Sequence, residues 1–231
     1  MLGDLLFSLK DIEFIFNLFG YISFRSGLSL VNSFLIVILL MPHWITFQQK
    51  LFPSGQPIRD DGPQTHFYKK GTPALGGVLI LFSIILSSIL WTSNFSKFNY
   101  ILILSLLLFG IIGFIDDFKK VKMGKGISSK TKFLLQLLAT VFLYFTIKQN
   151  GFDLNKFSIP FLKDVSIELG YLYFVLILLI VIGSTNATNL TDGLDGLVSM
   201  PLIFVFLTFA IFAYVLGNIN FSDYLLVNYM K

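Results

Sequence analysis

The chain has 231 residues, of which 55% are hydrophobic and only 13% charged, and its formal net charge is +4 at pH 7. Because so few charged residues cannot cover the surface of a soluble domain of this length, the composition excludes that class and indicates a membrane protein. Cysteine is absent, which excludes disulfide bonds.

The first 25 residues scatter charged side chains among apolar ones at helix-like spacing: Asp4, Lys10, Asp11, Glu13 and Arg25. This pattern predicts a helix that lies at the membrane interface. A secretory signal is not expected, because the segment lacks a basic start, an uninterrupted apolar centre and a small-residue cleavage site.

Six apolar runs follow between turn signals. Since a membrane-spanning helix needs roughly 20 mostly apolar residues, each run predicts one span. The sequence shows no internal repeat and no soluble domain, so we expect an all-α polytopic protein in which residues 1–231 form one membrane-embedded domain. The predicted spans are Leu28–Phe47, Ala74–Ser93, Tyr100–Ile115, Lys132–Ile147, Leu169–Ser184 and Pro201–Leu216.

The distribution of Lys and Arg predicts the orientation of these spans. Ten of them lie in or beside the loops after the first and third spans, and seven lie elsewhere. Basic residues favour the cytoplasmic side, so the loops after spans one, three and five should be cytoplasmic. No nucleic-acid partner is expected, and the lipid bilayer is the principal surrounding.

Each of these three loops contains a polar cluster with paired carboxylates. The first cluster, RDDGPQTHFYKKGTPALGG, covers residues 59–77. The second is Asp116 with Asp117, followed by lysines. The third, NATNLTDGLDG, covers residues 186–196. Such oxygen ligands suit Mg²⁺, and the lysines suit phosphate oxygens, so the pattern predicts Mg²⁺-assisted phosphoryl transfer at the cytoplasmic surface.

The third cluster carries the strongest signal. Asn186, Asn189 and Asp192 recur every three residues, so on a helix they occupy neighbouring positions of one side. Amides and a carboxylate are costly against lipid, and this loop has no basic residue to pair with them. The cluster therefore indicates a divalent cation or a hydroxyl-rich ligand.

Other readings of the clusters exist. Carboxylates at the end of a span are often solvated loop charges, and the lysines after Asp117 also serve as positive-inside anchors. A transporter or channel would place a charge or a broken helix at mid-membrane, whereas the centres of these spans are apolar. A non-catalytic membrane scaffold would leave the three clusters without a role.

Three sequence motifs, GPQTHFYKKGTPALGG, GFIDDFKK and NATNLTDGLDGL, resemble the signatures of the phospho-N-acetylmuramoyl-pentapeptide-transferase family. The aspartate pair alone is typical of the wider superfamily of polyprenyl-phosphate N-acetylhexosamine-1-phosphate transferases. The first motif favours the muramoyl-pentapeptide branch. A GlcNAc-1-phosphate transferase that uses the same lipid is the alternative enzyme.

The resemblance implies transfer of phospho-MurNAc-pentapeptide from its UDP carrier to undecaprenyl phosphate, with Mg²⁺ as cofactor and with lipid I and UMP as products. It implies catalysis by Asp116 and Asp117, one of which either deprotonates the attacking lipid phosphate or forms a covalent aspartyl intermediate, and we favour direct attack by the lipid phosphate. Because neighbours on a helix point about 100° apart, the other aspartate can orient a lysine or the metal. It also implies a bacterial inner membrane protein with its active site on the cytoplasmic face, and it allows a homodimer. The implied substrate-binding residues are Lys69, Lys120, Lys132, Asn186, Asn189, Asp192, Gly193, Leu194 and Asp195, and the implied metal ligands are Asp117 and Asp192.

The chain departs from the family pattern in two respects. Ala74 and Leu75 stand where the family usually has Thr and Met, which removes one hydroxyl group. The family has about ten spans, including a magnesium-binding aspartate loop that six spans would not contain, so the 231-residue chain by itself is expected to insert without catalysing transfer. At the second span, Thr72 should cap the helix and Pro73 should open it.

Overall fold

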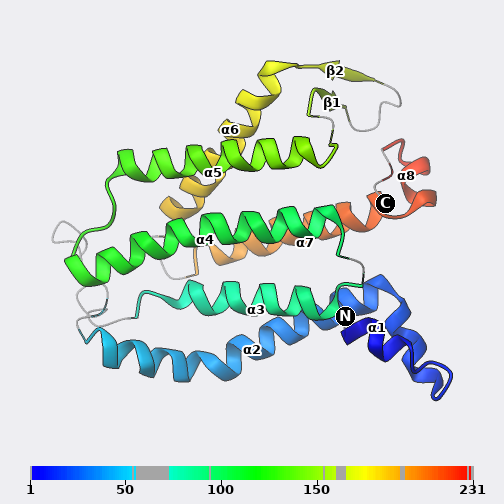
Figure 1. Ribbon diagram of the computed structural model, residues 1–231, viewed down its shortest axis with the longest axis horizontal. Helices are drawn as coiled ribbons and strands as arrows, with labels where there is room; N and C mark the ends of the chain where they lie inside the picture. The colour runs from blue at the N-terminus through cyan, green and yellow to red at the C-terminus, as the bar shows by residue number, and fades with distance from the viewer. Residues whose placement is uncertain are drawn as a thin grey trace. The chain divides into compact units, whose positions relative to one another are not determined.

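The computed structural model describes residues 2–53, 55, 73–93, 95–152, 154–159, 165–192, 196–227 and 229. The chain divides into two compact units, Met1–Ala139 and Thr140–Lys231. In chain order the elements are α1 (Leu2–Phe7), the 3-10 helix η1 (Phe14–Gly20), α2 (Ile22–Leu51), α3 (Gly76–Trp91), α4 (Lys97–Met123), α5 (Ser129–Gln149), β1 (Lys156–Ser158), β2 (Ser166–Glu168), α6 (Tyr171–Thr191), α7 (Ser199–Leu216) and α8 (Ile219–Tyr224) (Figure 1).

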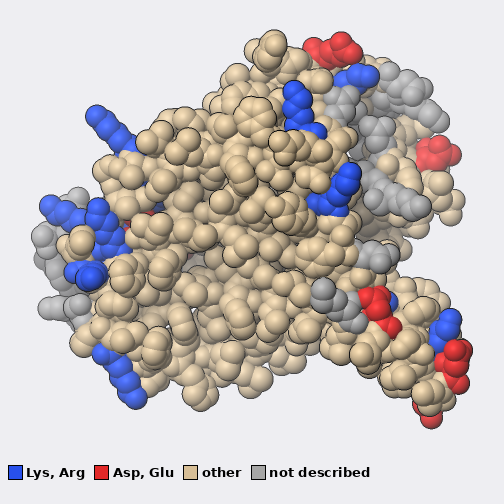
Figure 2. Space-filling view, in the orientation of Figure 1, with Lys and Arg blue, Asp and Glu red and all other residues tan. Residues whose placement is uncertain are grey.

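The predicted all-α membrane architecture is confirmed. Helices α2, α4, α5, α6 and α7 are long and apolar enough to cross a membrane, and α3 is a shorter apolar helix of 16 residues. Large hydrophobic side chains are exposed along these helices, and Figure 2 shows little charge on the visible face. A surface of this kind is stable in lipid and would be unstable in water.

The N-terminal segment is not the single helix that the sequence predicted. The structure forms the two short elements α1 and η1, and α2 begins at Ile22, before the charged Arg25. The Arg25 side chain is buried, forms an ion pair with Asp4 at 2.9 Å and donates a hydrogen bond to the carbonyl of Phe19. A buried guanidinium needs such partners, so the segment folds back around Arg25 and its helix is interrupted.

Helices α2 and α3 pack through small polar side chains. Ser83 and Ser87 of α3 are fully buried. The hydroxyl oxygens of Ser83 and Ser33 lie 3.2 Å apart, and the Ser87 hydroxyl accepts a hydrogen bond from the Asn32 side chain at 3.1 Å. Small residues let two helices approach closely, and hydroxyl groups satisfy polar partners where no water is present. These contacts hold α2 and α3 side by side within the first unit (Figure 1).

The start of α3 also differs from the prediction. Thr72 lies outside the described residues, and the helix begins at Gly76 rather than at Pro73. Two side chains of α2 satisfy the backbone just before it: Trp44 donates to the Leu75 carbonyl at 3.0 Å, and Gln48 accepts from the Leu75 amide at 3.3 Å. The tertiary contact with α2 therefore fixes this boundary in place of a local cap.

Helix α4 continues for eight residues beyond Ile115, where the predicted third span ends. The Ser96 side chain caps its N-terminus by accepting from the Asn99 amide, and Gly124, in the left-handed conformation at φ 76°, ends it. Glycine adopts this conformation without steric cost, which makes it a common terminator. The extension places the aspartate pair and its lysines on the last turns of a helix.

The second unit contains a small hairpin that the sequence analysis missed. Strands β1 and β2 pair antiparallel, with Phe157 opposite Ile167. Three-residue strands carry too little alternation to stand out among apolar spans. Within this unit, Tyr144 of α5 packs edge-to-face on Phe174 of α6 with ring centroids 4.8 Å apart.

Candidate active site

The aspartate pair lies near the C-terminal end of α4, and its two members have different surroundings. The side chain of Asp116 is 7% exposed, whereas that of Asp117 is 41% exposed. Neighbouring residues on a helix point about 100° apart, so one carboxylate can face the protein while the other faces outward. The two aspartates are therefore suited to different tasks.

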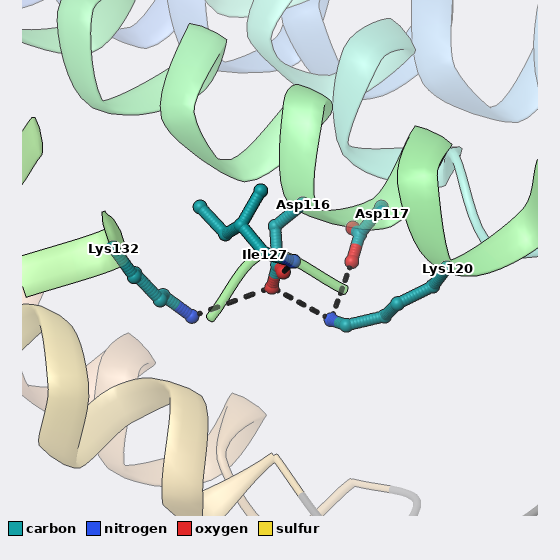
Figure 3. Close-up of polar contacts among 5 residues, drawn as sticks. All are labelled: Asp116, Asp117, Lys120, Ile127 and Lys132. Carbon is teal, nitrogen blue, oxygen red and sulfur yellow. Dashed lines mark hydrogen bonds and ion pairs between the residues drawn. The ribbon is translucent and has the colours of Figure 1, made fainter. Parts of the chain in front are cut away.

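Asp116 is held by three nitrogen groups (Figure 3). Its Oδ1 accepts a hydrogen bond from the backbone amide of Ile127 at 3.0 Å. Its Oδ2 lies 2.9 Å from the ammonium group of Lys120 and 3.5 Å from that of Lys132. Together these contacts compensate the negative charge of a buried carboxylate and leave neither oxygen without a partner.

Lys120 connects the two carboxylates. Its Nζ lies 2.9 Å from Asp116 Oδ2 and 2.9 Å from Asp117 Oδ1, which corresponds to i,i+4 and i,i+3 spacings on α4. Side chains at these spacings meet on one helix face. A cation between two neighbouring carboxylates reduces their mutual repulsion, so both can carry negative charge in the same site.

Lys132 reaches the site from the next helix. Ser128 precedes α5, and its Oγ accepts a hydrogen bond from the Thr131 amide at 3.2 Å, which stabilises the first turn. Lys132 lies in that turn, and its side chain is only 19% exposed. The short connection between α4 and α5 thus brings a second lysine to Asp116.

Aromatic side chains on α4 and at the end of α2 pack together near the aspartate pair in sequence. Phe118 packs against Phe114 on α4, and its ring also meets that of Phe52 edge-to-face, with centroids 5.9 Å apart. Phe52 follows the end of α2, so the contact joins the ends of two predicted spans.

The predicted third cluster is partly described. Asn186 and Asn189 lie on the last turns of α6 and Asp192 is its C-cap residue, which confirms the helical spacing expected for the first two. The Asn186 side chain donates to the Ile182 carbonyl at 2.8 Å, while Asn189 and Asp192 are exposed. Gly193, Leu194, Asp195 and the predicted phosphate ligand Lys69 lie outside the described residues.

Comparison with known proteins adds an independent finding. The model of the family described as "Glycosyl transferase family 4" matches residues 99–230, which include the aspartate pair, Lys120, Lys132 and the α6 cluster. The chain belongs to glycosyl transferase family 4. The match extends from α4 to the end of α8 and beyond, and therefore covers more than half of the chain.

A curated relative supports the narrower resemblance. The chain is 40% identical over 233 residues to the phospho-N-acetylmuramoyl-pentapeptide-transferase of Rickettsia prowazekii (strain Madrid E). The alignment covers 100% of this chain and 64% of the relative, so the chain spans less than two thirds of that protein's length. The predicted resemblance to this type of family 4 member is confirmed.

The described residues fit Mg²⁺ only in part. Among them, no group of three or more His, Cys, Asp or Glu side chains is placed to hold a metal ion. Asp116 fits poorly, because both of its oxygens already contact nitrogen groups. Asp117 fits better, since its side chain is partly exposed and Mg²⁺ often binds one carboxylate together with phosphate oxygens and water.

Sequence reasoning missed two contributors to this candidate site, the Gly126 backbone and the Ile127 amide. The amide holds Asp116, and Gly126 packs directly against the same carboxylate. The available signal was Gly126 itself, a second glycine in the short stretch that joins two helices. Its meaning depends on a contact with a residue ten positions earlier, which sequence spacing alone does not reveal.

Proposed function

We propose that this protein transfers phospho-MurNAc-pentapeptide from UDP-MurNAc-pentapeptide to undecaprenyl phosphate, with formation of lipid I and release of UMP. The main support is the full-chain similarity to a curated phospho-N-acetylmuramoyl-pentapeptide-transferase, together with membership of glycosyl transferase family 4. The apolar helices support a bacterial inner membrane location, which suits a lipid acceptor.

The site geometry supports phosphoryl transfer through a division of work between the two aspartates. We assign Asp116 to positioning, since it is buried and fixes Lys120 and Lys132. We assign Asp117 to contact with substrate, because its side chain is partly exposed next to Lys120. Fixed ammonium groups stabilise the charge that develops on a phosphoryl group in the transition state.

The proposed reaction begins with the lipid phosphate, whose remaining proton passes to the Asp117 carboxylate as general base. An oxygen of that phosphate then forms a bond to the sugar-linked phosphorus of the donor. The bond between this phosphorus and the bridging pyrophosphate oxygen breaks, and UMP leaves with that oxygen. Lys120 and Lys132 would bind the phosphate oxygens during this exchange.

Mg²⁺ is part of the proposal. Bound at Asp117, with Asp192 as a second proposed ligand, Mg²⁺ would neutralise charge on the pyrophosphate. We further propose that Asn186 and Asn189 bind the nucleotide sugar together with Asp192, Gly193, Leu194, Asp195 and Lys69, and that the site faces the cytoplasm, where UDP-linked sugars are made.

The test measures UMP release by the full-length protein in detergent with undecaprenyl phosphate and Mg²⁺. We expect turnover with UDP-MurNAc-pentapeptide, loss of turnover when the metal is chelated, and negligible turnover with UDP-GlcNAc. The Asp117→Asn variant is the inactive control. Turnover with UDP-GlcNAc alone would replace the proposal with the GlcNAc-1-phosphate alternative, and no turnover with either donor would contradict both.

A further inference from the structure

Gly126 lies unusually close to the buried aspartate of the pair. A Cβ atom added at Gly126 would be 2.3 Å from Oδ1 of Asp116, and 3.1 and 3.2 Å from side-chain carbons of Lys120. Real Cβ atoms do not approach another heavy atom to within 3.0 Å, so any side chain at this position must displace its neighbours. The backbone at Gly126 does not have the positive φ that itself requires glycine.

The neighbours cannot move without losing contacts. The Asp116 oxygen nearest to Gly126 is the one that accepts the Ile127 amide at 3.0 Å, and the other oxygen contacts Lys120 and Lys132. Aspartate has a short side chain, so a shift of its carboxylate away from residue 126 would lengthen these contacts together. Lys120 would move with it, and Lys120 also contacts Asp117.

We infer that Gly126 is a positioning residue, whose missing side chain lets the α4–α5 connection close onto Asp116. The closed connection fixes Lys120 and Lys132 at the Asp116 carboxylate, and Lys120 also contacts Asp117. The inference rests on the proposed function for its catalytic consequence, although the contact itself does not. Gly126 acts only through Asp116 and the two lysines. Its effect should therefore depend on the presence of the Asp116 carboxylate.

The first experiment replaces Gly126 with alanine in the full-length protein. A displacement of about 1 Å at a reacting centre can cost on the order of a hundredfold in rate, so we expect kcat to fall by about 10- to 100-fold. The matched control is Gly113→Ala on α4, the helix that carries Asp116, where an added Cβ would meet nothing within 4 Å. That control should keep kcat within about twofold of the wild type.

A double-mutant cycle separates positioning from a general structural effect. The four proteins are wild type, Gly126→Ala, Asp116→Ala and the double variant, each assayed for kcat and for melting temperature in the same detergent. Without the carboxylate, the added methyl group has no atom to displace at 2.3 Å. We therefore expect Gly126→Ala to change kcat less than about twofold in the Asp116→Ala background, which is strong non-additivity.

The outcomes are decisive in both directions. A loss in the wild-type background that disappears in the Asp116→Ala background supports the inference. Equal losses in both backgrounds, or a Gly126→Ala variant with near-normal kcat, would overturn it. The melting temperatures need no substrate, so if no donor is turned over by the wild type, coupling between the two positions in melting temperature still tests the contact, and its absence rejects it.

Discussion

Two polar clusters lie at the C-terminal ends of apolar helices, and their side chains are organised differently. At the connection between α4 and α5, the Asp116 carboxylate is buried and contacts groups 4, 11 and 16 residues further along the chain. At the end of α6, the Asn186 amide bonds to its own helix, and Asn189 and Asp192 are exposed. The first cluster is defined by tertiary contacts and the second by helical spacing.

This difference has a physical consequence for function. Groups that are fixed before substrate arrives stabilise a transition state without reorganisation during the reaction, which suits the α4–α5 cluster to catalysis. Exposed side chains keep their rotational freedom and lose it when a ligand binds, which suits the α6 cluster to recognition. Substitutions in the two regions should therefore affect different measured quantities.

The largest effect should come from the exposed aspartate of the pair. Asp117→Asn removes the proposed general base while it keeps the shape of the side chain, so kcat should fall at least about a hundredfold. The melting temperature should change little, because this side chain is 41% exposed and its ion pair with Lys120 is correspondingly weak. UMP release measures the change in kcat, and thermal unfolding measures the change in melting temperature. Near-normal turnover would show that Asp117 is a solvated charge without a catalytic role.

Asp116→Asn should lower kcat at least about a hundredfold as well, but with a loss of stability. An asparagine still accepts the Ile127 amide, while Lys132 loses its ion pair with Asp116 and Lys120 keeps only the one with Asp117. Hydrogen bonds to charged groups contribute about 1.5–3 kcal/mol each, so the melting temperature should fall by several degrees. Equal melting temperatures for the Asp116 and Asp117 variants would contradict the difference between the buried, hydrogen-bonded Asp116 carboxylate and the exposed Asp117 carboxylate.

A smaller effect is expected at the end of α6. Asp192→Asn should raise the KM for the nucleotide sugar by about tenfold, the equivalent of about 1.4 kcal/mol, with a smaller change in kcat. Its melting temperature should match that of the wild type, since Asp192 is exposed. Steady-state kinetics at saturating lipid provides the check, and a fall in kcat at constant KM would instead indicate that Asp192 acts mainly as the proposed Mg²⁺ ligand.

The last prediction tests whether both clusters face the same side of the membrane. Because the chain has no cysteine, single replacements Lys122→Cys and Leu190→Cys give unique labels at two exposed positions. The Lys and Arg distribution predicts that an impermeant thiol reagent modifies both from the cytoplasmic side only. Labelling of the two positions from opposite sides would exclude a shared site, and labelling of both from outside the cell would contradict the predicted orientation.

The sequence was sufficient for the class of protein and for most elements. Apolar runs of the right length predicted the positions of α2 to α7, because a spanning helix must be apolar across the whole thickness of the hydrocarbon core. The N-terminal segment was the exception. There the burial of Arg25 against Asp4 and the Phe19 carbonyl interrupts a pattern that looks continuous in sequence.

The aspartate pair was also visible in the sequence as a candidate site, since two adjacent carboxylates at the end of an apolar run are unusual there. The spacings of Lys120 from Asp116 and Asp117 indicate contact along one helix, which the structure confirms. Only the tertiary structure decided which aspartate is buried, that Lys132 and the Ile127 amide complete its contacts, and that Gly126 must be small. These features depend on how the α4–α5 connection closes over one face of α4, and burial on a helix face is determined by what packs against it.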